Sequence, residues 1–261
     1  MRFVADFDPT TPSIARVYDY INGGKDNFAA DRELAQRLID IFPPITVTVT
    51  ENKRFLDLAV SWAAGQGIGQ FIDIGCGLPT SPGTHESARI SMPDARVAYV
   101  DIDPIVLSHL RCLPARQQAG LTIVDGDVRD VEKVIDAVSG GLDLSQPACV
   151  IMAALLHFFP VETGQDLVAR YTARLAPGSY VILTMGLADG PAADKFFDLY
   201  NKRGSAPLYK HSANEFASFF GELPLIPPGV GDARTWRPGW PKVPVPPERE
   251  AVMIVGVAQV P

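Results

Sequence analysis

The sequence predicts an open α/β fold with a mostly parallel sheet, and three observations carry this prediction. Short apolar runs alternate with helical patterns along much of the chain, which is the order of a sheet covered by helices. The run that ends at Asp73 continues into the glycine-spaced turn Gly75-Cys76-Gly77. Aspartates also follow the ends of the next runs, at the edge where folds of this class bind their ligands.

The strand predicted over residues 70–74 ends in a turn that suits a nucleoside-containing ligand. Gly75 and Gly77 let the backbone bend sharply and approach a ligand closely. A dinucleotide-binding turn has a third glycine three residues later, where this sequence has Thr80. Asp73 would repel a pyrophosphate and attract a cation, and S-adenosylmethionine carries an ammonium and a sulfonium instead of phosphates. Taken alone, the turn is also compatible with an ordinary strand-to-helix connection.

The second predicted strand, over residues 96–100, supports a nucleoside site. It ends at Asp101, 24 residues beyond Gly77. One carboxylate at this position can accept hydrogen bonds from both hydroxyls of a ribose. Asp103 precedes Pro104 and is predicted to cap the helix that begins there. We therefore assign Asp101 to the ribose and Asp103 to the helix cap.

The third and fourth predicted strands supply the rest of the edge. The strand over residues 121–125 leads to Asp127 and Val128, where the carboxylate could accept from an adenine amino group and the Val128 N–H could donate to a ring nitrogen. The run over residues 148–154 is continuously apolar, as expected of a strand that is buried on both faces. His157 follows at its carboxyl end.

Longer motifs resemble the class I S-adenosylmethionine-dependent methyltransferases. The shared motifs are Phe71-Ile-Asp-Ile-Gly-Cys-Gly77, Tyr99-Val-Asp-Ile-Asp-Pro104 and Gly126-Asp-Val128. The run Arg16-Val-Tyr-Asp-Tyr-Ile-Asn-Gly-Gly-Lys-Asp-Asn-Phe28, together with Glu51-Asn-Lys-Arg-Phe-Leu56, is similar to a narrower group. This is the bacterial S-adenosyl methyltransferase family first catalogued as a domain of unknown function (DUF574-like).

The resemblance extends from about residue 12 to the end of the chain. It implies a Rossmann-like fold with a seven-stranded, mostly parallel sheet whose last strand is antiparallel, and N-terminal cover helices. It also implies an enzyme that uses S-adenosylmethionine. The cofactor-binding residues we expect are Asp73, Gly75, Cys76, Gly77, Asp101, Ile102, Asp127, Val128, Ala153 and Tyr20.

We expect one methyltransferase domain over residues 1–261, with a helical cover at 1–66 and a core at 67–261 that has inserted helices at about 186–221. The cover is predicted to hold a helix that begins at Thr11-Pro12 and a second from about Phe28 to Phe42. Residues 45–62 alternate at first like a strand but continue with helical spacing, so one helix is predicted. A proline-rich connection over residues 224–247 then leads to the last strand.

Composition excludes several classes of function. A net charge of −7 without a run of Lys or Arg argues against nucleic-acid binding. No apolar stretch has the length of a membrane span. Three cysteines without close pairing suit a cytoplasmic protein. No His or Cys spacing indicates a metal site, and the sequence leaves the oligomeric state open.

The predicted reaction is direct transfer of a methyl group to a small-molecule acceptor. Such a displacement needs alignment more than a covalent nucleophile. If the acceptor must lose a proton, His157 is the candidate base, although a structural role at a helix start is an equal alternative. His85 and Tyr20 are reserve candidates for the base. The candidates for the substrate pocket are Tyr18, Lys25, Asn27, His85 and Tyr200.

Two other functions remain open from the sequence. The first is a regulatory protein that binds S-adenosylmethionine without transferring its methyl group. The second is an NAD-dependent oxidoreductase, which Asp73 and the missing third glycine disfavour. The acceptor and the atom that is methylated are not specified by these residues.

Overall fold

A computed structural model describes residues 8–243 and 251–261 of the chain. In this described part, seven strands form one sheet in the order β3-β2-β1-β4-β5-β7-β6. The strands are β1 (Gln70–Ile74), β2 (Arg96–Asp101), β3 (Leu121–Asp125), β4 (Cys149–Ala153), β5 (Tyr180–Ala188), β6 (Gly231–Asp232) and β7 (Ala251–Gln259). Strands β1 to β5 run parallel to one another, and β7 runs antiparallel to β5 and β6. The predicted sheet is therefore confirmed.

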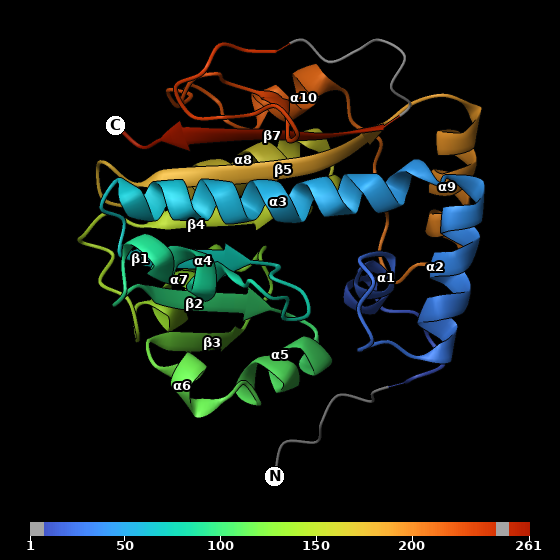
Figure 1. Ribbon diagram of the computed structural model, residues 1–261, viewed down its shortest axis with the longest axis horizontal. Helices are drawn as coiled ribbons and strands as arrows, with labels where there is room; N and C mark the ends of the chain where they lie inside the picture. The colour runs from blue at the N-terminus through green and yellow to red at the C-terminus, as the bar shows by residue number, and fades with distance from the viewer. Residues whose placement is uncertain (1–7, 244–250) are drawn as a thin grey trace.

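Strand register brings the predicted aspartates to one edge of the sheet. Asp73 of β1 lies beside Tyr99 of β2, and Asp101 of β2 lies beside Asp125 of β3. Because side chains alternate between the two faces of a strand, Asp73, Tyr99 and Asp101 all project from the same face. Figure 1 shows the arrows of β2 and β4 pointing toward α1 at this carboxyl edge.

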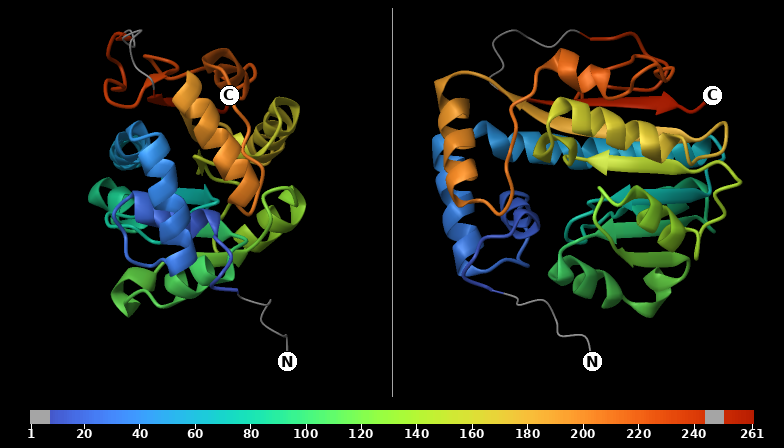
Figure 2. Two further views of the ribbon diagram at one scale, coloured as in Figure 1. Left: turned by 90° about the vertical axis from the view of Figure 1, so that its right-hand side faces the viewer. Right: turned by 180° about the vertical axis from the view of Figure 1, so that it is seen from behind.

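Helices cover both faces of the sheet. One face packs under α3 (Pro44–Gly65), α4 (Thr84–Ser91) and α5 (Pro104–Arg111), and the other packs against α7 (Val131–Val138), α8 (Val161–Thr172) and α10 (Ala213–Ser218). Seen from behind in Figure 2, α8 lies over the face opposite α3. The short helices α6 (Ala115–Gln118) and η1 (Leu156–Phe158) lie in connections.

A separate helical group covers the carboxyl edge of the sheet. It consists of α1 (Ile14–Ile21), α2 (Ala29–Ile41) and α9 (Pro191–Arg203), and these helices stand beside the ends of the strands in both figures. They share a small apolar core that includes Val17, Leu38, Phe42 and Phe196. The group thus joins the N-terminal segment to the region inserted after β5.

The structure refines several predicted boundaries. Residues 45–62 lie in one helix, as predicted, but α3 packs on β5 and β7 and so belongs to the sheet's own helical layer. Helix α1 begins at Ile14 instead of Thr11-Pro12, after Ser13, whose hydroxyl donates to Asp103 Oδ2 at 2.6 Å. Within the proline-rich connection the described residues contain only the two-residue edge strand β6, and residues 244–250 lie outside the described part.

Candidate functional site

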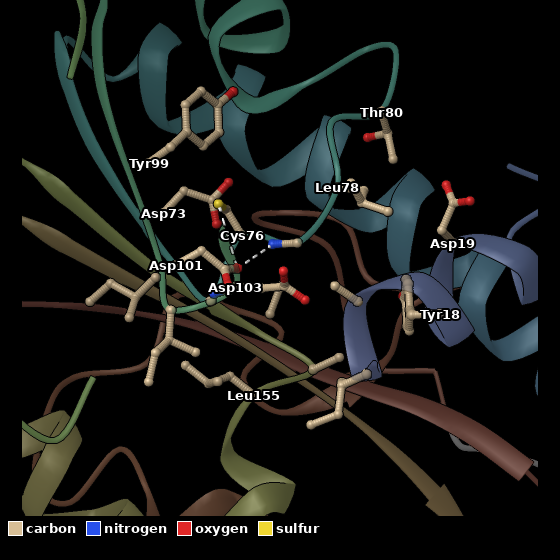
Figure 3. A pocket seen from close by; sticks show the side chains of 18 of the residues that line it. Tyr18, Asp19, Asp73, Cys76, Leu78, Thr80, Tyr99, Asp101, Asp103 and Leu155 are labelled. Carbon is tan, nitrogen blue, oxygen red and sulfur yellow. Dashed lines mark hydrogen bonds between the residues drawn. The ribbon is translucent and has the colours of Figure 1, made fainter. Parts of the chain in front are cut away.

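A cavity of about 1280 Å³ opens at the carboxyl edge of the sheet. Its walls come from the ends of β1 to β4, from α1 and α3, and from residues 78–87, 155–163 and 205–209. Figure 3 shows Asp73, Cys76 and Asp101 on one side of the cavity, and Tyr18 and Asp19 of α1 opposite them. Pockets for small ligands usually have volumes of roughly 300–1,000 Å³, so this cavity has room for more than one ligand.

The turn after β1 has the backbone shape that its glycines predict. Gly75 and Gly77 have φ values of 65° and 66°, in the left-handed region that disfavours side chains. The Gly75 N–H donates to the carbonyl of Val100 at 2.8 Å, which fixes the turn against β2. A Cβ at Gly75 would lie 2.8 Å from Leu155 Cδ1. The glycine therefore allows a close approach between the turn and the segment after β4.

Asp101 is held by main-chain donors from the neighbouring turns. Its Oδ2 accepts from Gly77 N–H and its Oδ1 from Asp103 N–H, each at 2.9 Å. Burial raises the pKa of the Asp101 carboxyl, and these hydrogen bonds oppose the rise. Asp103 accepts from the Ile105 N–H at 2.8 Å and caps α5, as predicted.

Asp73 is a buried carboxyl group beside Asp101. The Thr84 hydroxyl donates to its Oδ2 at 2.5 Å. Burial raises the pKa of Asp73 to about 6, and the charge of Asp101 adds to the rise. Removal from water penalises a carboxylate that lacks a positive partner, so a cationic ligand would stabilise the ionised form of Asp73.

Cys76 belongs to the turn after β1 and lies close to both Asp73 and Asp101. Its Sγ is 3.9 Å from Asp101 Oδ2. Burial raises the pKa of the thiol well above its usual range, and the negative charges of Asp101 and Asp73 raise it further. The thiol therefore stays protonated and has no nucleophilic role.

The turn after β3 presents Asp127 and Val128 to the cavity. The Arg129 guanidinium pairs with both carboxylate oxygens of Asp127, and these hydrogen bonds lower the pKa of that carboxyl. The Val128 carbonyl accepts from the Tyr171 hydroxyl at 3.0 Å. Asp127 therefore remains ionised, and Arg129 shares the carboxylate that was predicted to meet an adenine amino group.

The cavity brings together most of the predicted cofactor residues. Its lining contains all of the expected set except Tyr20, which means Asp73, Gly75, Cys76, Gly77, Asp101, Ile102, Asp127, Val128 and Ala153. The Tyr20 hydroxyl instead donates to Gln36 Oε1 of α2 at 3.2 Å. Two residues along a helix turn the side chain by about 200°, so Tyr18 and Tyr20 cannot both face the cavity.

The predicted pocket candidates separate into two groups. Tyr18 and His85 line the cavity, whereas Lys25, Asn27 and Tyr200 do not. Asn27 donates its amide to Asp19 Oδ2 at 2.8 Å. Tyr200 is buried in the core that α9 shares with α1 and α2. Sequence spacing could not show this separation, because it depends on how the cover helices pack.

Two histidines reach the cavity in different environments. His85 is buried, with Nδ1 2.8 Å from the Tyr99 hydroxyl and with Nε2 lacking a partner among the described residues. His157 lies in η1, and desolvation lowers its pKa to about 3, with a smaller contribution from the charge of His211. A general base works best when its pKa lies near the working pH. With a pKa of about 3, His157 is neutral and a weak base, and its role as the general base stays a prediction.

The structure adds cavity residues that the sequence interpretation did not single out. From α3 these are Asn52 and Lys53, and from the segments after β4 and β3 they are Phe158 and Arg129. The Asn52 amide donates to the Tyr18 hydroxyl at 2.9 Å. Both Asn52 and Lys53 belong to the motif at residues 51–56, so their place in the cavity lining had a sequence signal that was not interpreted.

Searches restricted to the described residues give two negative results. Over residues 8–243 and 251–261, no group of His, Cys, Asp and Glu side chains is arranged to hold a metal ion. In the same part of the chain, no helix combines the length and apolar character needed to cross a membrane.

Comparison with known proteins gives a consistent family assignment. The family model described as "S-adenosyl methyltransferase" matches residues 3–261. A crystal structure of a putative methyltransferase from Thermobifida fusca YX is 37% identical, with a TM-score of 0.87 and coverage of 98% of this chain and 96% of that chain. A DUF574 family protein from Streptomyces avermitilis MA-4680 is 32% identical, with a TM-score of 0.88 and coverage of 97% and 99%, respectively.

More distant structures share the fold. An O-methyltransferase family protein from Burkholderia thailandensis is 13% identical, with a TM-score of 0.53 and coverage of 83% of this chain and 57% of that chain. At this level of identity the similarity extends to the fold alone. No curated protein matches the sequence.

Proposed function

Because the chain belongs to the S-adenosyl methyltransferase family, we propose that it transfers the methyl group of S-adenosylmethionine to a small, uncharged acceptor. The cofactor and the enzyme class follow from the family. The nature of the acceptor is our proposal, and it rests on the wall of the cavity that follows β4.

The donor set at the carboxyl edge fits the cofactor. Asp101 is fixed by two main-chain N–H groups and retains lone pairs for the two ribose hydroxyls. Asp73 is a buried carboxyl group that would face the cationic methionine end. The turn at Gly126–Val128 would receive the adenine, with Arg129 moving to share Asp127. When bound, the cofactor supplies a methyl group that is activated by its sulfonium.

The wall after β4 carries the proposal about the acceptor. Its lining residues lie in segments 155–163 and 205–209 and include Phe158, Pro207 and Tyr209. None of the lining residues in these segments is an acid, a lysine or an arginine. His157 is the one histidine among them, and its pKa of about 3 keeps it neutral. An uncharged wall with aromatic side chains favours a neutral acceptor, because a charged group buried there would lose its hydration without gaining a partner.

Two hydrogen bonds hold this wall in place. The Tyr209 N–H donates to the His157 carbonyl at 2.8 Å, and His211 Nε2 lies 3.1 Å from the Phe159 carbonyl. The connection after α9 is therefore tied to the segment after β4. The wall would align the acceptor and exclude water, and alignment of this kind can lower a barrier by ~7–11 kcal/mol. The neutral His157 imidazole would accept a hydrogen bond from the acceptor.

A turnover assay with matched acceptors tests the proposal. Phenols, amines and carboxylic acids of similar size would be incubated with the cofactor, and release of S-adenosylhomocysteine would be measured. We expect turnover to be confined to acceptors that are neutral at the assay pH. Turnover of only cationic, anionic or peptide acceptors would contradict the proposed acceptor class. Cofactor binding without turnover of any class would contradict methyl transfer to a small molecule.

A further inference from the structure

One wall of the cavity combines a lysine, a phenol and an amide that the sites described above leave unused. The wall forms where α1 meets α3, and it contains Tyr18, Asn52 and Lys53. It faces Asp73 and the glycine turn from the opposite side, as the position of Tyr18 in Figure 3 shows. We call these three residues the α1–α3 cluster.

The charges around the cavity single out Lys53. The lining residues include three lysine or arginine side chains, Arg16, Lys53 and Arg129. Arg16 forms a buried ion pair with Asp31, and Arg129 pairs with Asp127. Within the described residues, Lys53 forms no ion pair or hydrogen bond through its side chain. It is thus the cation of this wall that is available to an anionic ligand group.

The two carboxylates of the cavity lining that lie closest to this wall in the sequence, Asp19 and Asp57, are already bonded within the protein. Asp19 Oδ2 accepts from the Asp26 N–H at 3.0 Å and from the Asn27 amide at 2.8 Å. Asp57 Oδ1 accepts from the Ser87 hydroxyl at 2.6 Å. These interactions close the turn after α1 and join α3 to α4. Neither carboxylate forms an ion pair with Lys53.

Asn52 and Tyr18 add one acceptor and one donor. The Asn52 amide donates to the Tyr18 oxygen at 2.9 Å, so the phenol proton remains free to be donated. Burial raises the pKa of Tyr18 to about 12, which keeps that proton in place. Asn52 is 3% exposed, and its Oδ1 has no partner among the described residues. A buried polar atom without a partner costs free energy unless a ligand or water satisfies it.

We propose that the α1–α3 cluster binds the amino-acid end of the cofactor, with Lys53 and Tyr18 on its carboxylate and Asn52 Oδ1 on its ammonium. This inference rests on the proposed use of S-adenosylmethionine. The carboxylate would be repelled by Asp73 and Asp101 and attracted to Lys53 across the cavity, whereas the sulfonium would favour Asp73. The cluster would thereby distinguish the complete cofactor from nucleosides that lack the amino acid.

Calorimetric binding to three probes tests this assignment. S-adenosylmethionine carries both groups, its decarboxylated analogue keeps the amine, and 5′-methylthioadenosine lacks both. For Lys53→Met we expect affinity for S-adenosylmethionine to fall about 10- to 100-fold, the range for a lost hydrogen bond to a charged group. Affinity for the other two probes should change less than about twofold. Lys53→Arg should restore most of the affinity, and Tyr18→Phe should weaken binding of S-adenosylmethionine alone.

Arg54 provides a matched control, because it is the next residue of α3 and lines a different groove. Arg54→Met removes the same charge and should leave all three affinities unchanged. Equal weakening of all three probes by Lys53→Met, or no weakening of any, would overturn the assignment. A Lys53→Met variant that raises only the KM of the acceptor would also overturn it. If the unmodified protein binds none of the probes, the proposed function itself fails, and that outcome is distinct from the others.

Discussion

The two sides of the cavity hold their polar groups in different ways. On the strand side, Asp101 accepts from two main-chain N–H groups and Asp73 accepts from the Thr84 hydroxyl. On the helical side, the ring of His157 and the Oδ1 of Asn52 have no hydrogen-bond partner from the described residues. The two aspartates of the strand side are therefore oriented before any ligand binds, whereas Asn52 and His157 on the helical side have polar atoms left for a ligand.

This difference separates the part of the site that the backbone holds from the part that side chains supply. Main-chain donors at strand ends depend on the fold, so the strand side should serve any family member that uses the same cofactor. The helical side depends on side chains from α1, α3 and two connections, which can change without altering the sheet. Variants on the strand side should therefore affect cofactor affinity most, and variants on the helical connections should affect the acceptor.

The largest effect is expected for Asp101→Ala. The variant removes a carboxylate that would bind both ribose hydroxyls, and each hydrogen bond to a charged group contributes ~1.5–3 kcal/mol. Cofactor affinity measured by calorimetry should therefore fall at least about 100-fold.

Asp125→Ala is the matched control for this loss. Asp125 lies beside Asp101 in the sheet register and ends the next strand, but it is absent from the cavity lining. The cofactor affinity of the Asp125→Ala protein should stay within about twofold of that of the parent protein. Circular dichroism of this variant would show whether the strand ends tolerate an alanine. An Asp101→Ala protein that is folded and binds the cofactor with normal affinity would contradict the proposed ribose contact.

An intermediate effect is expected from the titration of Asp73. Its pKa of about 6 means that the carboxyl is protonated at lower pH and cannot then attract the cationic end of the cofactor. Affinity should rise with pH through about 6, by up to about tenfold per pH unit below that value. Calorimetry over pH 5 to 7 would measure this dependence, and Asp73→Asn should flatten it and weaken binding at pH 7.

The protein without cofactor should show the opposite trend in stability. The raised pKa means that the folded state holds the proton of Asp73 more tightly than the unfolded state, in which the pKa is near 3.8. The contribution of Asp73 to the free energy of unfolding should therefore decrease as the pH rises from about 4 to about 6. Thermal unfolding of Asp73→Asn would lack this decrease. An unchanged pH dependence in the variant would assign the titration to another group.

The smallest effect on cofactor affinity is expected for His157→Phe. The variant keeps an aromatic ring and removes the nitrogen atoms, so cofactor affinity should change less than about twofold. Loss of one neutral hydrogen bond to the acceptor, worth ~0.5–1.5 kcal/mol, should lower kcat/KM by about 3- to 10-fold. The pKa of His157 is about 3, so this residue does not titrate near pH 6.5. The pH profiles of kcat/KM for the parent protein and for His157→Phe should therefore have the same shape around that pH.

His109→Phe serves as the control for this variant. His109 lies on α5, outside the cavity lining, and its replacement should leave both quantities unchanged. A loss of cofactor affinity in His157→Phe would contradict the proposal that the strand side binds the cofactor and that the segment after β4 contacts the acceptor.

Much of the strand side could be predicted because its signals are local. A glycine two residues after another, an acid at a strand end and a proline after Asp103 each report a nearby backbone requirement. The structure contains the positive φ values at Gly75 and Gly77 and the Asp103 cap. Parallel strands in register place their carboxyl ends at one edge of the sheet, and the alternation of side chains along each strand places these local features on one face.

The helical side was predicted less well because its signals are not local. Tyr18 and Tyr20 have the same chemistry and neighbouring positions, yet only Tyr18 lines the cavity. Tyr200 was expected in the pocket but packs in the core of the cover helices. The direction of a helical side chain depends on which face the helix buries, and that face is chosen by partners distant in the sequence.

The sequence by itself determined the sheet, the glycine turn and the aspartates that follow its strands, because each depends on short-range backbone geometry and hydrophobic periodicity. Only the tertiary structure decided which cover residues face those aspartates, and it brought Tyr18, Asn52 and Lys53 into one wall. It also decided that His157 is neutral, since desolvation by packed neighbours lowers its pKa. Burial and long-range packing are properties of the assembled chain, and they set the chemistry of the helical side of the cavity.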